Sequence, residues 1–187
     1  MIDVDVWSWG PFVKLVIARI TLAASLVCGC SSGLDKETTE LLDATAFFWA
    51  QLEDGVTPAG GGQITRIVVG KTVVFAGGPD GDYVFESPEK CIVKILFSTG
   101  LGRSTGNINF NVVTRMEVEP DHRGNTDWDS VAIEGSKSVC FGNTCKYQLW
   151  QPIIGPKGMS PSERIALRDR YTRVVAFIRK RCPGTRS

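Results

Sequence analysis

The residues with the greatest potential for chemistry lie in one polar segment, from Asp121 to Asp129, which holds the only histidine of the chain. Its Asn125, Asp127 and Asp129 have the spacing of the first three ligands of a calcium-binding loop. The pattern then fails, because Ser130 replaces the required glycine and Ser136 replaces the bidentate glutamate. We therefore predict no metal site. Since an exposed tryptophan favours binding, we interpret the segment as a polar binding loop formed by His122, Asn125, Asp127, Trp128 and Asp129.

Other segments carry weaker signals of chemistry. The stretch from Gly100 to Gly106 lacks both the Gly-Lys-Ser/Thr ending of a phosphate-binding loop and the GxGxxG spacing, so we expect a hairpin loop there. No GxSxG, HExxH or SxxK motif occurs in the sequence. We predict no catalytic residues and no cofactor. A hydrolase remains an alternative if the fold brings together the carboxylates of Asp80, Asp82, Glu86, Asp127 and Asp129.

The charge balance argues against one class of partner. The chain of 187 residues has 21 lysines and arginines against 20 acidic residues, for a net charge of +1. Because nucleic-acid binding depends on neutralising phosphates with clustered basic residues, this balance predicts no nucleic-acid partner.

The beginning of the chain has the pattern of an export signal. Lys14 and Arg19 precede a largely apolar run of eight residues, from Ile20 to Val27. That length suits a signal peptide and falls far short of the roughly 20 residues needed to span a bilayer. The opening from Met1 to Pro11 is too acidic and aromatic for a signal peptide, and translation starting at Val13 is a hypothesis that would explain it.

The sequence Val27-Cys28-Gly29-Cys30 resembles the lipobox of bacterial lipoproteins, although Cys28 stands where alanine or serine is usual. The resemblance implies that residues 1–29 are removed, that Cys30 carries the acyl chains (palmitate among them) and that residues 30–36 form a tether. In a Gram-negative cell, Ser31 after the acylated cysteine implies sorting to the outer membrane, on its periplasmic face. Plain secretion without a lipid is the alternative.

If Cys28 and Cys30 are used in this way, four cysteines remain in the mature chain. An even number of cysteines in an oxidising compartment predicts two disulfides. Cys140 and Cys145 flank a four-residue loop that contains Gly-Asn, which suits a bridge across a hairpin. Cys91 is then left to pair with Cys182. A metal or redox site is the less favoured use of these four residues.

The pattern of apolar residues predicts an α+β domain over residues 37–187. Helical spacing runs from Thr38 to Leu52, and a second helix starts at a Ser160-Pro161-x-Glu163 cap and buries Leu167, Tyr171, Val174, Val175 and Ile178. Between them we predict about seven short antiparallel strands in a bent sheet or small barrel. The strand segments are Ile64 to Phe75 with a turn at Gly70-Lys71, Tyr83 to Glu86, Cys91 to Phe97, Asn107 to Val118, Asp129 to Glu134, Lys137 to Phe141 and Cys145 to Gln151.

Together these features predict a lipid-anchored extracytoplasmic envelope protein with a structural or binding role. The expected partners are the membrane, through the lipid, and a protein of the envelope. One alternative is an inhibitor or immunity-type lipoprotein that contacts its partner through Leu101 to Thr105 or His122 to Trp128. Another is a carrier of a small apolar ligand, which needs a cavity between the sheet and the face from Tyr171 to Ile178.

Overall fold

The computed structural model describes residues 33–56, 63–78, 81–99, 102–120, 129–155, 158–182 and 184. Within these ranges, two helices accompany an antiparallel sheet of eight strands that does not close into a barrel. The helices are α2 (Lys36–Ala50) and α3 (Pro161–Arg181). The strands are β1 (Thr65–Val69), β2 (Thr72–Gly78), β3 (Gly81–Glu89), β4 (Ile92–Thr99), β5 (Gly102–Asn109), β6 (Arg115–Pro120), β7 (Asp129–Phe141) and β8 (Thr144–Pro152).

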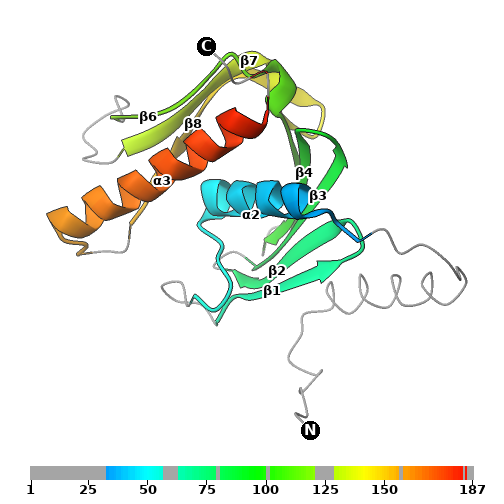
Figure 1. The fold of residues 1–187 in the computed structure, drawn as a ribbon, viewed down its shortest axis with the longest axis horizontal. Helices are drawn as coiled ribbons and strands as arrows, with labels where there is room; N and C mark the ends of the chain where they lie inside the picture. The colour runs from blue at the N-terminus through cyan, green and yellow to red at the C-terminus, as the bar shows by residue number, and fades with distance from the viewer. Residues whose placement is uncertain are drawn as a thin grey trace, which may run out of the picture.

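The sheet is a meander from β1 to β5 and then branches at β7, which pairs with β5, β6 and β8. Strands β1 to β5 pair in sequence order, and β8 pairs with one side of β7. The other side of β7 pairs with β5 through its last residues and with β6 through its first residues. The 3-10 helix η2 (Phe110–Val112) joins β5 to β6. The sheet therefore has two arms, and α2 and α3 lie side by side in the angle between them (Figure 1).

The helices form where their local sequence satisfies the free backbone groups at their ends. The Asp35 side chain accepts a hydrogen bond from the Thr38 amide at 2.8 Å and so caps α2. The predicted capping box of Ser160 and Glu163 is present at the start of α3. Tyr171, Val175 and Ile178 of α3 are buried in the core, as the helical spacing predicts.

Three predicted strand boundaries were wrong. The single strand expected from Asn107 to Val118 is two strands, β5 and β6, separated by η2. The two strands expected on either side of Gly135 are one long strand, β7, with a register shift between Glu134 and Val139. The hairpin loop expected from Gly100 to Gly106 is largely strand, because β5 already pairs with β4 from Gly102 onward.

The bend of β7 depends on the missing side chain of Gly135. A Cβ atom there would lie 2.2 Å from the Val112 carbonyl oxygen and 2.9 Å from the Val113 Cα. Gly135→Ala should therefore destabilise the protein by about 1–3 kcal/mol, because neither backbone atom can move without breaking the packing of η2. The measurement is the free energy of unfolding in urea.

Gly106→Ala is the matched control for Gly135→Ala. Gly106 is also buried in a strand, but a Cβ there would meet only ordinary contacts of 3.8–3.9 Å. Equal stability losses in the two variants would contradict the proposed role of Gly135.

Candidate functional site

The binding loop predicted from the sequence falls between β6 and β7. His122, Asn125, Asp127 and Trp128 lie outside the described residues. Asp129 is the first residue of β7, and its carboxylate lies 3.7 Å from Nε of Arg168 on α3. Strand β7 therefore begins beside the first half of α3.

One face of β6, β7 and β8 carries a group of interacting polar side chains. Arg115 forms ion pairs with the carboxylates of Glu117, Glu119 and Glu134. The distances to Glu119 and Glu134 are both 2.7 Å. Trp150 of β8 donates its indole N–H to Glu119 at 2.9 Å. We call these five residues the Arg115 cluster.

Strand geometry explains the Arg115 cluster. Arg115, Glu117 and Glu119 alternate along β6, so their side chains leave the same face of the sheet. The antiparallel register then places Glu134 directly opposite Arg115. The hydrogen bonds that Arg115 donates to Glu134 and, with a smaller effect, to Glu117 raise the pKa of Arg115, against the opposing effect of desolvation. With three carboxylates around one guanidinium, the cluster keeps a negative charge that favours a basic partner.

One buried hydroxyl lies beside the Arg115 cluster. Ser130 is fully buried, and its Oγ has no hydrogen-bond partner among the residues that the structure describes. The register pairs Ser130 with Glu119 on one side and with Pro152 on the other, so it belongs to the same face. Because an unpaired buried hydroxyl carries a desolvation cost, this position is the least satisfied polar site on that face.

A second surface feature is a cavity of about 790 Å³ at the other end of the helices. It opens where the described chain begins, at Gly33, and is bordered by the first turn of α2. Lys71 lines it from the β1–β2 turn, Lys90 from the β3–β4 turn, and Arg181 from the end of α3. Its lining is partly polar and partly apolar, with Leu34, Leu41 and Pro88 among the apolar members.

A shallower groove of about 380 Å³ lies between α2, α3 and the first strands. In it, Arg66 forms a bidentate pair with Asp43 through contacts of 2.7 and 2.8 Å. The Asp43 hydrogen bond raises the pKa of Arg66. Arg170 pairs with Glu53 and lies over the Phe47 ring, 4.7 Å from its centre. The charged groups of this groove therefore stabilise one another.

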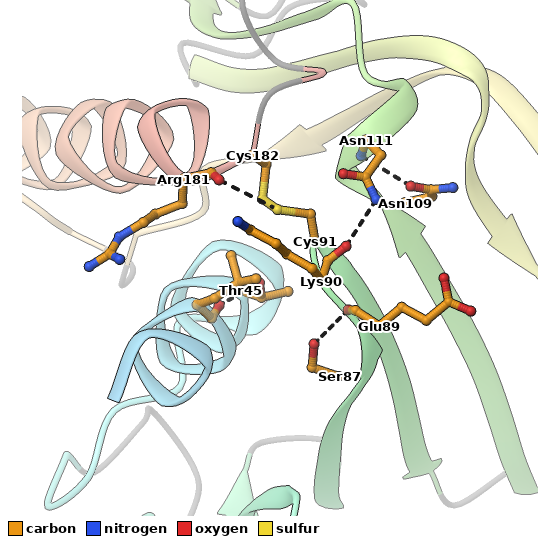
Figure 2. Close-up of a disulfide and its surroundings, with 10 residues drawn as sticks. Thr45, Ser87, Glu89, Lys90, Cys91, Asn109, Asn111, Arg181 and Cys182 are labelled. Atoms are coloured by element: carbon orange, nitrogen blue, oxygen red, sulfur yellow. Dashed lines mark hydrogen bonds between the residues drawn. A yellow bond between two sulfur atoms is a disulfide. The ribbon is translucent and has the colours of Figure 1, made fainter. Parts of the chain in front are cut away.

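Both predicted disulfides are present. Cys91 is bonded to Cys182 and Cys140 to Cys145. The Cys91–Cys182 bond ties the β3–β4 turn to the end of α3, and Cys91 Sγ also lies 3.7 Å from the Arg181 carbonyl oxygen (Figure 2). Cys28 and the predicted lipidation site, Cys30, lie outside the described residues.

The carboxylates considered for a hydrolase have separate partners where the structure describes them. Asp82 accepts a hydrogen bond from the Gly77 amide, Glu86 pairs with Lys94, and Asp129 pairs with Arg168. Asp80 and Asp127 lie outside the described residues. Within the described ranges, no three histidine, cysteine, aspartate or glutamate side chains gather closely enough to hold a metal ion.

The apolar face of α3, considered as one wall of a carrier cavity, is packed in the core. Tyr171 packs against Phe47 with the rings tilted by 47° and their centres 4.9 Å apart, and burial raises the pKa of its hydroxyl. Neither helix of the described residues is long and apolar enough to cross a bilayer.

Comparison with known proteins gives no relative. No family model, curated protein or solved structure matches the chain. The Arg115 cluster was not predicted from the sequence, although the alternation of Arg115, Glu117 and Glu119 is a sufficient signal that their side chains share one face of a strand. The pairing with Glu134 and Trp150 has no such local signal, because it depends on the register of β6, β7 and β8.

Proposed function

We propose that this chain is a lipid-anchored extracytoplasmic protein of the cell envelope with a non-enzymatic structural or binding role. Cys30 carries the acyl chains, and the outer membrane, on its periplasmic side, is the location we favour. The observation that supports the proposal best is the pair of disulfides, Cys91–Cys182 and Cys140–Cys145. Stable disulfides belong to oxidising compartments, which is where the export signal would direct the chain.

The interactions on the surface support a binding role over a catalytic one. A general acid or base needs a carboxylate that is free to exchange a proton with a substrate. In the structure, Asp43, Glu53 and Asp129 are each held by an arginine. These pairs fix the arrangement of α2, α3 and the sheet, as a rigid binding platform requires.

The Arg115 cluster favours a more specific version of this role, namely an inhibitor or immunity-type lipoprotein. The cluster lies on β6 and β7, the two strands that carry the 121–128 segment. In this version, the partner is an envelope protein with a basic surface that meets the carboxylates of Glu117, Glu119 and Glu134.

The experiment that tests the proposal is the intact mass of the protein purified from its native membrane, measured with and without reduction. We expect a chain that begins at Cys30 with two or three acyl chains. We also expect a gain of about four daltons on reduction, because two disulfides take up four hydrogen atoms. An unmodified chain beginning at Met1 with free thiols would refute the proposal.

A further inference from the structure

The chain between Cys30 and the described fold is too short to let the fold stand away from the membrane. Three peptide units separate Cys30 from Gly33, which limits their Cα–Cα distance to about 11 Å. Gly33 lines the 790 Å³ cavity, and two residues later Asp35 caps α2. If Cys30 is acylated, as proposed above, the edge of this cavity at Gly33 must lie within about 11 Å of the Cα of the lipid-bearing residue.

The rest of the molecule extends much further than this tether. Helix α3 has 21 residues, so its first residue lies roughly 30 Å from Arg181 at the cavity. Helix α2 has 15 residues and runs about 22 Å away from its capped end. Near the far end of α2, Trp49 contacts Phe141 with ring centres 5.6 Å apart. A tether of about 11 Å therefore does not allow the molecule to turn its far end toward the lipid.

At the end of the molecule near the tether, two lysines, Lys71 and Lys90, form no ion pair with any residue that the structure describes. Arg181 already pairs with Glu37 at 2.5 Å and with Glu40 at 3.0 Å. The Asp35 carboxylate accepts hydrogen bonds from Thr38. Lys71 and Lys90 are both exposed at the cavity, whose lining also holds the carboxylates of Asp35, Glu37 and Glu89.

Both lysines occupy rigid positions. Lys71 lies in the two-residue turn between β1 and β2. Lys90 lies in the turn between β3 and β4, next to the Cys91–Cys182 disulfide (Figure 2). Its backbone carbonyl also accepts a hydrogen bond from the Asn111 side chain at 2.9 Å. These turns hold the two ammonium groups at the same end of the sheet as the tether.

We propose that this end of the molecule rests on the phospholipid headgroups of the membrane that carries the Cys30 lipid. Lys71 and Lys90 contact the phosphates, since lysines close to an anionic lipid surface are attracted to it. The inference rests on the proposed acylation of Cys30 and adds an orientation to it. Arg168, the partner of Asp129, lies about 20 Å along α3 from Arg181, so the strand ends that carry the 121–128 segment point away from the membrane.

Lysine acetylation of the native protein tests this orientation. The acylated protein, verified by intact mass, is placed in vesicles of phosphatidylcholine and phosphatidylglycerol, neither of which has a primary amine, or in a non-ionic detergent. It is then labelled briefly with an amine-reactive reagent, and the modified lysines are quantified by peptide mass spectrometry. Lys146 is the internal control, because it is exposed like Lys71 and Lys90 but lies over the Phe141 ring near the far end of α2.

We expect Lys71 and Lys90 to react about fivefold more slowly in vesicles than in detergent. This ratio corresponds to the roughly 1 kcal/mol that a lysine gains near an anionic lipid surface. Lys146 should react equally in both. Equal slowing of all three lysines, or slowing of Lys146 alone, would overturn the orientation but leave the acylation standing. A mass without acyl chains would overturn both.

Discussion

Removing the Cys91–Cys182 disulfide by the double change Cys91→Ala/Cys182→Ala should lower the free energy of unfolding by about 4–5 kcal/mol. The bond closes a loop with a sequence separation of 91, and a cross-link of that length strongly restricts the unfolded chain. Both sulfur atoms belong to residues that are almost fully buried. For a chain of this size the melting temperature should fall by roughly 10–15 °C, which thermal unfolding followed by circular dichroism can measure.

The second disulfide provides the matched control for this prediction. Cys140 and Cys145 are separated by only five positions and lie opposite each other on paired strands. The same chain-entropy relation gives about 2 kcal/mol for so short a loop. The double change Cys140→Ala/Cys145→Ala should therefore lower the free energy of unfolding by about half as much as Cys91→Ala/Cys182→Ala does. A larger loss from the short-loop variant would contradict the explanation that the long bond stabilises the protein by closing a long loop of the unfolded chain.

The disulfide pairing could be predicted from the sequence because one of its two bonds is local. A Gly-Asn loop between Cys140 and Cys145 predicts a hairpin, and the hairpin places the two cysteines opposite each other. The long bond then follows by elimination. The start of α3 was predictable for a similar reason, since Ser160 and Glu163 complete a cap within four residues.

The break between β5 and β6 could not be predicted, because distant contacts cause it. The Phe110 amide donates to the Cys91 carbonyl oxygen at 2.8 Å, and the Asn111 side chain donates to Lys90. These bonds hold η2 against the β3–β4 turn, about twenty residues earlier in the chain. The alternation of apolar residues showed only that the strand bends near Val113 and not that a 3-10 helix interrupts it.

The amino-acid composition of the segment after Gly100 led to a wrong prediction, because pairing with β4 determines its structure. The stretch after Gly100 has the small and polar residues of a loop, but Thr105 pairs with Leu96 and Gly102 with Thr99. Pairing with β4 therefore outweighs the weak strand propensity of these residues. The Arg115 cluster could not be predicted for the same reason, because it depends on how β6, β7 and β8 pair. The local sequence indicates only that the three residues of β6 share a face.

Replacing Cys30 with alanine should remove the protein from the membrane fraction. Acyl chains are attached through the cysteine sulfur, and a lipid anchor with two or more chains gives stable membrane association, whereas the described helices supply no span. We expect Cys30→Ala to lack acyl mass and to appear as unprocessed precursor or soluble protein, as fractionation, immunoblotting and intact mass would show.

Cys28→Ala is the control for Cys30→Ala, because it places the usual small residue in the lipobox-like sequence and should leave processing unchanged. If Cys30→Ala keeps its membrane association while Cys28→Ala loses it, the acylated residue is Cys28. The tether to Gly33 would then be two residues longer, and its reach would increase to about 19 Å. Even that reach is shorter than the roughly 30 Å length of α3, so the cavity lined by Lys71 and Lys90 would still face the lipid. If neither change affects association, the anchor is not at this sequence, and both the lipoprotein proposal and the orientation derived from it fail.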